Sequence, residues 1–157
     1  MSEPLLDASM VTELMAKCAT DARELAASRF QMPLDGTFES IQVLENILCV
    51  QYNDIPRGWK RIFKKPPTEQ QLQHFALLWG GYLGEVLRER LGGAWTYAEE
   101  GVMAGAACLD INGTLISPPA KVMKRLLNGP EDDLWIYAYI IDHDQKKEKE
   151  KSDSSPE

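Results

Sequence analysis

The sequence predicts an α+β protein with three N-terminal helices, a small three-stranded antiparallel sheet, and one or two C-terminal helices. Apolar residues recur at three- and four-residue steps through most of the first 91 positions, which is typical of helices. The period then changes to two, as in strands, and a helical pattern returns after residue 117. A length of 157 residues suffices for one hydrophobic core. We therefore expect a single domain over residues 1–144, and a disordered charged tail over residues 145–157, which lack apolar side chains.

Two helices are expected in the first 52 residues. Asp7 or Ser9 can cap the first helix, whose apolar positions continue to about Phe30. A stretch rich in proline, aspartate and glycine follows, after which Thr37 can cap a second helix that extends to about Tyr52. Prolines and glycine then indicate a loop over residues 53–67.

A third helix is marked at both ends. Thr68 and Gln71 have the spacing of a capping box, and glycines follow Leu91, where the helix should end. Arg90 falls on the apolar stripe, so its guanidinium must find a partner or reach the surface. Three glycines inside this helix predict a close approach of neighbouring elements; they are Gly80, Gly81 and Gly84.

The sheet is predicted from three short extended stretches, residues 95–100, 106–111 and 114–116. Asn112-Gly113 suits a two-residue hairpin turn, because both central positions need a positive φ. Ser117-Pro118 then begins a fourth helix that ends at Asn128-Gly129. Residues 134–141 follow a proline and three acids and are interpreted as a helix, although their aromatic and branched side chains also suit a strand.

The composition favours a cytoplasmic protein. The three cysteines are scattered and odd in number, which indicates reduced thiols. The first residues lack the basic segment of a signal peptide, and the longest apolar run has eight residues, far fewer than the roughly 20 of a membrane span. With two histidines, and no metal-ligand spacing around them, we expect no metal, no cofactor and no membrane partner.

One segment, residues 57–65, combines five positive charges with Trp59 and Phe63. Such residues can clamp phosphates and stack on bases, which would indicate nucleic-acid binding. A net charge of −7, from 24 acidic and 17 basic residues, opposes that function. We instead expect the aromatic side chains to hold this loop against the body of the protein while the lysines are solvated.

Three segments of the sequence stand out together. They are Leu34-Asp-Gly-Thr-Phe-Glu-Ser-Ile-x-x-Leu-Glu-Asn-Ile-Leu, Trp79-Gly-Gly-Tyr-Leu-Gly-Glu-Val-Leu-Arg with Leu91-Gly-Gly-Ala-Trp95, and Pro118-Pro-Ala-Lys-Val-Met-Lys-Arg-Leu-Leu-Asn-Gly-Pro-Glu-Asp-Asp133-Leu. In these segments the chain resembles an uncharacterised family of small bacterial α+β proteins, a domain of unknown function. The resemblance spans residues 34–141 and implies an α+β fold and a cytoplasmic bacterial origin. Similar small acidic proteins act as immunity partners of secreted toxins.

The charge and the lack of a complete catalytic constellation favour a non-enzymatic protein-interaction module, with no catalytic residue assigned. In this hypothesis an immunity-type protein neutralises a basic toxin through an acidic face. The residues of that predicted acidic face are Glu99, Glu100, Glu131, Asp132 and Asp133.

The alternative hypothesis is a small-molecule-binding protein or enzyme with a pocket between the third helix and the sheet. Its predicted binding residues are Glu85, Trp95, Lys121, Lys124 and Arg125. The three cations can equally form ion pairs with the acids at 131–133 across the intervening turn. Leu77 and Leu78 lie on the polar side of the third helix and leave open a homodimer contact there.

Overall fold

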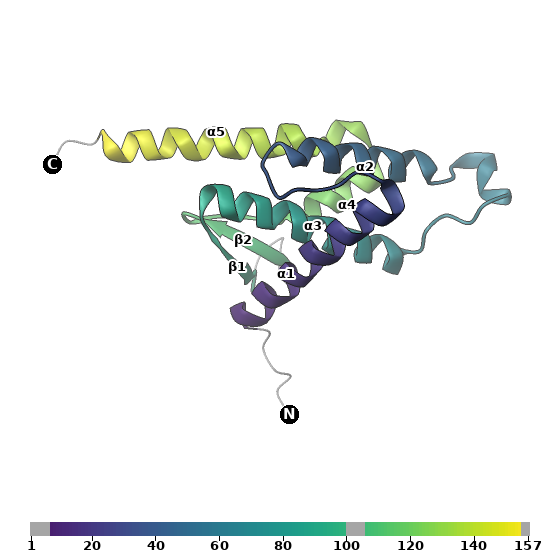
Figure 1. The fold of residues 1–157 in the computed structure, drawn as a ribbon, viewed down its shortest axis with the longest axis horizontal. Coiled ribbons are helices and arrows are strands. Elements are labelled where there is room, and N and C mark those ends of the chain that lie inside the picture. Colours follow the sequence, from purple (N-terminus) through teal and green to yellow (C-terminus); the bar gives the residue numbers. More distant parts are fainter. Residues whose placement is uncertain (1–6, 100–105, 155–157) are drawn as a thin grey trace, which may run out of the picture.

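The computed structural model describes residues 7–99 and 106–154 and confirms the α+β class (Figure 1). Within these residues, five α-helices accompany one three-stranded antiparallel sheet of order β1-β2-β3. The elements are α1 (Ala8–Leu25), α2 (Ser40–Asp54), α3 (Glu69–Leu91), β1 (Ala94–Tyr97), β2 (Ala107–Ile111), β3 (Thr114–Ile116), α4 (Pro118–Asn128) and α5 (Leu134–Asp153). Three short turns join them, the π-helical η1 (Ala26–Phe30) and the 3-10 helices η2 (Gly58–Ile62) and η3 (Pro130–Asp132).

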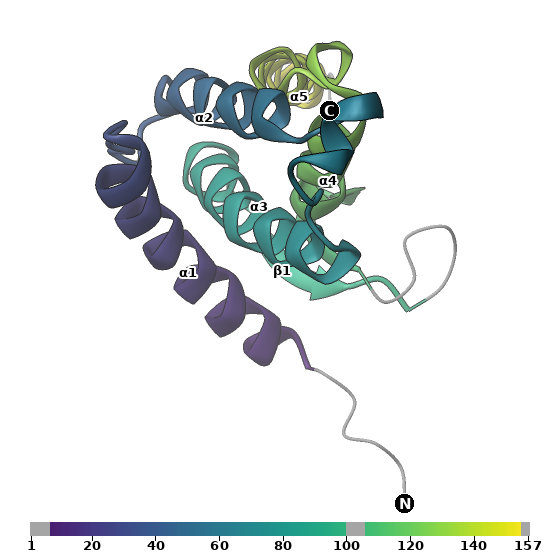
Figure 2. The same cartoon turned by 90° about the vertical axis from the view of Figure 1, so that its right-hand side faces the viewer.

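Helix α3 is central, with α1 and α4 packed against it (Figure 2). Its glycines permit these contacts, as the sequence predicted. A Cβ atom on Gly80 would lie 2.6 Å from the backbone nitrogen of Pro119 in α4, and one on Gly81 would lie 2.6 Å from Cβ of Cys18 in α1. Both distances are too short for carbon, so glycine lets the helices approach at these positions.

The predicted local signals at the ends of α3 and of the β2–β3 hairpin are confirmed. The Gln71 backbone N–H donates to Thr68 Oγ1 at 3.2 Å, and the Thr68 N–H donates to Gln71 Oε1 at 2.9 Å, which completes the capping box. Asn112 and Gly113 have φ values of 53° and 87°, as the hairpin turn requires. The register places Trp95 opposite Leu109.

The first two helices differ from expectation at their ends. Helix α1 begins after an Asp7 cap, but its last turn widens into η1 and ends at Gln31, which has a φ of 53°. Thr37 Oγ1 accepts a hydrogen bond from the Ser40 N–H at 3.3 Å, yet the α-helix itself begins only at Ser40.

Residues 134–141 are helical, and α5 continues to Asp153, where we expected a disordered tail. Two side-chain contacts lie just beyond the apolar part of this helix. Gln145 is buried and its Oε1 accepts a hydrogen bond from Asn112 at 3.1 Å, while Lys146 forms a 2.9 Å ion pair with Asp142. Within residues 7–99 and 106–154, no helix is long and apolar enough to cross a membrane.

Arg90 finds the partner that its place on the apolar stripe required. Its Nε and Nη2 donate to the two carboxylate oxygens of Asp142 at 2.8 and 3.3 Å, and its guanidinium lies 4.5 Å from the Phe38 ring centroid. The Asp142 side chain is nearly buried. The Arg90 hydrogen bonds, aided by Lys146 and opposed by burial, hold the pKa of Asp142 below its usual value.

We expect Asp142→Asn to lower the free energy of unfolding by about 1 kcal/mol at neutral pH, because Arg90 is partly exposed and the pair is screened. The pKa of the Asp142 carboxyl is lower in the folded chain than in the unfolded chain, where it is near 4. The ionised carboxyl therefore stabilises the folded state fully above about pH 4, and this stabilisation is lost as the pH falls through the folded pKa. Urea unfolding across pH should therefore show the parent and the variant converging in acid. Asp144→Asn, at an exposed carboxyl of the same helix, is the control; a pH-independent difference for Asp142→Asn would contradict the prediction.

Candidate interaction surface

Two of the predicted binding residues, Glu85 and Trp95, are brought together, but as a packed pair. Trp95 is buried, and its Nε1 donates to Glu85 Oε1 at 2.8 Å. The other carboxylate oxygen accepts from Arg88 Nη2 at 2.6 Å. The Trp95 ring lies where a side chain on Gly84 would be, and so fills the space between α3 and the sheet. The pair stabilises the helix–sheet interface.

The three predicted cations of α4 have different surroundings. Lys121 Nζ forms a 2.9 Å ion pair with Asp132 and lies 5.3 Å from the Tyr137 ring centroid, whereas Lys124 is exposed. The ion pair across the turn to residue 132 thus forms for Lys121. Arg125 is buried, and its ion pair is with Glu45 of α2.

Arg125 is almost fully buried and links three helices. Its Nε donates to Glu45 Oε1 of α2 at 2.7 Å. Glu45 Oε2 accepts the backbone N–H of Leu134, the first residue of α5, at 3.0 Å. The guanidinium also lies 5.6 Å from the Tyr52 ring centroid. These contacts give Arg125 and Glu45 a structural role at the junction of α2, α4 and α5.

The predicted acidic face consists partly of carboxylates with partners in the chain. Asp132 accepts hydrogen bonds from Asn128 and Lys121, which hold its pKa below the usual value. Asp133 caps α5 by accepting the Ile136 N–H at 2.9 Å. Glu99 and Glu131 are exposed, and Glu100 lies outside the described residues.

The expectation that Leu77 and Leu78 are both exposed is wrong. Leu78 is buried in the core, and Leu77 alone is at the surface. The spacing of apolar residues along α3 predicts one buried face. In the structure α1 and α4 both pack on this helix, so more of its surface is buried. A homodimer contact through both leucines is therefore ruled out by the burial of Leu78.

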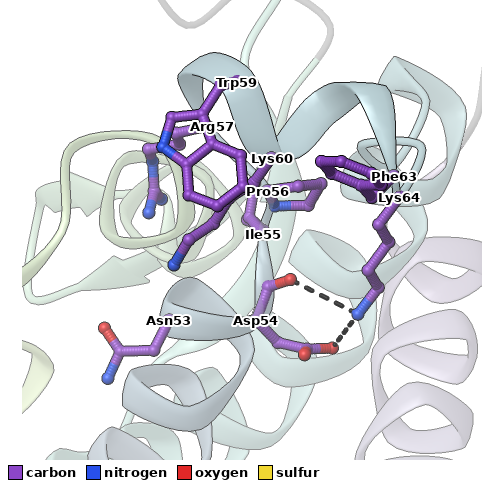
Figure 3. Close-up of a pocket in the computed structure, with 9 residues that line it drawn as sticks. All are labelled: Asn53, Asp54, Ile55, Pro56, Arg57, Trp59, Lys60, Phe63 and Lys64. Carbon is purple, nitrogen blue, oxygen red and sulfur yellow. Dashed lines mark hydrogen bonds and ion pairs between the residues drawn. The ribbon is translucent and has the colours of Figure 1, made fainter.

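The most exposed apolar side chains belong to the segment around η2, which we call the η2 finger (residues 55–65). Trp59, Ile62 and Phe63 have exposed fractions of 69%, 81% and 80%. The expectation that the aromatic side chains hold this loop against the body is therefore wrong. The Trp59 and Phe63 rings instead contact each other edge to face, with centroids 6.0 Å apart (Figure 3).

The base of the η2 finger is fixed by two polar contacts to the end of α2. Lys64 Nζ forms a 2.9 Å ion pair with Asp54 and lies 3.5 Å from its carbonyl oxygen (Figure 3). The Arg57 guanidinium lies 3.8 Å from the Tyr52 ring centroid. Between the tip and the end of α2 is an open hollow of about 510 Å³, lined by residues that include Trp59 and Phe63. The finger is thus attached at its base and exposes its apolar tip.

The η2 finger is also basic. Five of the chain's 17 lysine and arginine residues lie within nine positions, at Arg57, Lys60, Arg61, Lys64 and Lys65. All five are exposed. In a protein of net charge −7, this makes a local positive surface around an apolar tip. Large apolar groups rimmed by charge are typical of binding surfaces.

Two of the three cysteine thiols have raised pKa values. Burial raises the pKa of the Cys18 and Cys108 thiols, which disfavours the nucleophilic thiolate. No three His, Cys, Asp or Glu side chains gather as a potential metal site in the part of the chain that the structure describes.

Comparison with known proteins finds no match: no family model matches the chain, and neither a curated protein nor a solved structure matches it.

Proposed function

We propose that the chain is a non-enzymatic protein-interaction module that binds its partner through the η2 finger. The observation that carries the proposal is the exposure of Trp59, Ile62 and Phe63, each at least 69%, on one short basic segment. Exposing three large apolar side chains has no benefit for folding, because none of them is removed from water. Their burial by a partner would supply the main driving force for binding.

The residue types suit a protein contact. Tryptophan and arginine are among the residues that contribute most to interface affinity when a partner buries them, and phenylalanine is also enriched there. The hollow between the tip and the end of α2 offers a concave surface beside these apolar groups. The surrounding lysines and arginines favour acidic side chains on the partner, at distances below the Debye length of about 8 Å.

An immunity-type role through an acidic face is a second form of this proposal. It is supported by the exposure of Glu99 and Glu131 and by the net charge of −7. A basic toxin would be its partner. In one form of the proposal the partner binds the η2 finger, and in the other it binds the acidic face. One crosslinking experiment can therefore compare the two.

We expect a photo-crosslinking amino acid at position 63 to capture one dominant protein from native lysate, because Phe63 lies at the apolar tip. The same amino acid at Met10, an exposed apolar residue of α1, is the matched control and should not capture it. The readout is mass spectrometry of nuclease-treated, detergent-washed crosslinks. Lys60→Glu with Lys65→Glu should reduce the captured protein at least about tenfold, since both charges beside the tip are reversed.

Several outcomes would contradict the finger as the contact surface. Equal capture at positions 63 and 10, or no protein captured at all, would refute it. Loss of the product on nuclease treatment would indicate a nucleic-acid partner instead. If Glu99→Lys with Glu131→Lys abolishes capture while the finger variants do not, the acidic face is the binding surface.

A further inference from the structure

A second hollow adjoins the η2 finger, where the finger meets α3 and α4. It is open to solvent, has a volume of about 310 Å³, and is lined in part by leucines of those two helices. Three residues line both this hollow and the one beside the end of α2; they are Ile55, Pro56 and Arg57. The two hollows are therefore neighbours that share one short stretch of chain at the base of the finger.

The second hollow is apolar, and its charged lining residues are positive. Its apolar lining includes two prolines of the connecting loop and three leucines of α3 and α4, namely Pro66, Pro67, Leu72, Leu126 and Leu127. Leu126 is almost fully buried, whereas Leu127 is 57% exposed and leaves apolar surface for a ligand to cover. The charged residues that line the hollow are Arg57 and Arg61. The hollow thus suits an apolar group that has a negative charge beside it.

The positive charge of the η2 finger is largely uncompensated within the chain. Residues 55–65 contain five lysine and arginine residues and no acidic residue. Lys64 is paired with Asp54, and the Arg57 guanidinium lies over the Tyr52 ring, which carries no formal charge. In the part of the chain that the structure describes, the other three cations have no ion-pair partner; they are Lys60, Arg61 and Lys65. A partner that covers the finger must therefore supply negative charge, because burying unpaired cations is costly.

We propose that the occupant is a short acidic segment of the partner protein, which lies across the base of the η2 finger and places a large apolar side chain in each hollow. This rests on the proposed function of the finger. Hollows of about 310 and 510 Å³ are in the size range that takes up apolar ligand groups. Because they share one stretch of chain, a single continuous segment reaches both. Its carboxylates pair with Lys60, Arg61 and Lys65, and its apolar side chains cover Trp59 and Leu127.

An anionic membrane surface is the other partner that aromatic and basic residues fit, since such side chains insert at the level of the lipid headgroups. The two hollows favour the peptide segment. A bilayer surface can cover the tip at Trp59 and Phe63, but it does not fill concave sites at the base of the finger. Leu127 belongs to α4 and lines the second hollow, so a contact limited to the tip leaves it exposed.

The class of partner is tested by selecting random dodecapeptides, displayed on phage, for binding to the full chain. Enriched peptides should carry more acidic than basic residues and a large apolar side chain for each hollow. The tightest of them, synthesised with a fluorescent label, then gives a dissociation constant by anisotropy. Binding should weaken in high salt, because the Debye length falls from about 10 Å at 0.1 M to about 3 Å at 1 M. A selection that enriches no peptide, or only basic or uncharged ones, overturns the proposal.

Two variants test whether the second hollow belongs to the binding surface. Leu127→Glu places a negative charge in the apolar lining and Arg61→Glu reverses a charge beside it, so each should raise the dissociation constant of the peptide at least about tenfold. The matched controls, Leu14→Glu and Arg29→Glu, make the same changes at positions of α1 and η1 that line neither hollow, and should leave the constant unchanged. All four side chains are exposed, so each variant should fold, which circular dichroism checks.

Failure of the second hollow as a binding site can be told apart from failure of the whole finger. If Trp59→Ala abolishes peptide binding while Leu127→Glu and Arg61→Glu bind like the parent, the finger is the contact surface but the second hollow is not. If no acidic peptide is enriched while position 63 still captures a protein from lysate, the partner is a protein of another chemistry. Sedimentation with phosphatidylserine vesicles that is lost in Trp59→Ala, without peptide enrichment, would indicate a membrane partner and overturn both proposals.

Discussion

Glu45→Ala is expected to lower the free energy of unfolding by about 3 to 5 kcal/mol, one of the largest effects of any substitution in this chain. The change leaves the buried Arg125 guanidinium without its counter-charge. It also removes the acceptor of the Leu134 N–H, where α5 begins. Urea unfolding at neutral pH, followed by far-ultraviolet circular dichroism, measures the loss.

Two further variants separate the buried pair from a general effect of removing a charge. Asp21→Ala breaks the 2.8 Å ion pair with Lys17, in which the Asp21 side chain is 43% exposed and the Lys17 side chain 73% exposed. It should lower the free energy of unfolding by less than about 1 kcal/mol. Glu45→Met combined with Arg125→Met removes both buried charges and should recover much of the stability that Glu45→Ala loses. A Glu45→Ala variant that is no less stable than Asp21→Ala would show that the network contributes little.

Trp95→Ala is expected to lower the free energy of unfolding by about 3 to 5 kcal/mol, because it leaves a cavity between α3 and the sheet. It also leaves Glu85 Oε1 without the Trp95 donor. Trp59→Ala is the matched control. The same chemical change on the exposed η2 finger should alter stability by no more than about 0.5 kcal/mol. Similar losses for the two variants would contradict the packing role of Trp95.

Gly84→Ala tests the same contact from the helix side. In the parent chain the added methyl group overlaps the Trp95 ring, and overpacking of this kind costs about 1 to 3 kcal/mol. In the Trp95→Ala background the ring is absent, and the higher helix propensity of alanine should raise stability by up to about 1 kcal/mol. The sign of the Gly84→Ala effect should thus reverse between the two backgrounds. Additive effects of the two substitutions would show that the ring and the glycine do not contact each other.

The features of the fold that could be predicted from sequence are those set by neighbouring residues. The capping box at Thr68 and the turn at Asn112-Gly113 both depend on contacts within three positions, and both are confirmed. The hydrogen bond that joins α5 to the β2–β3 turn links Gln145 to Asn112, 33 positions earlier in the chain, which no local pattern shows. Leu78 was assigned to the wrong side for a similar reason, since helical periodicity gives the polar face but not how many helices pack around it.

The candidate site could be predicted in composition but not in arrangement. The combination of aromatic and basic residues at 57–65 was visible in the sequence, and the prolines and glycine around it indicated a loop. Whether Trp59 and Phe63 pack inward depends on the path of the chain beyond α2, and in the structure they contact each other. Likewise, a polar pattern on α4 did not distinguish the exposed Lys124 from the buried Arg125.

The attachment of the η2 finger at its base has a consequence for how the protein can evolve. None of the residues of η2 itself is buried, and the contacts that fix the finger are made by Arg57 and Lys64, at its two ends. Substitutions at Trp59, Ile62 or Phe63 therefore do not disturb the hydrophobic core. Selection against mutations that unfold the protein should act only weakly on these three positions. If the tip is the binding surface, as we propose, it can diversify in sequence while the sequence of the core is retained.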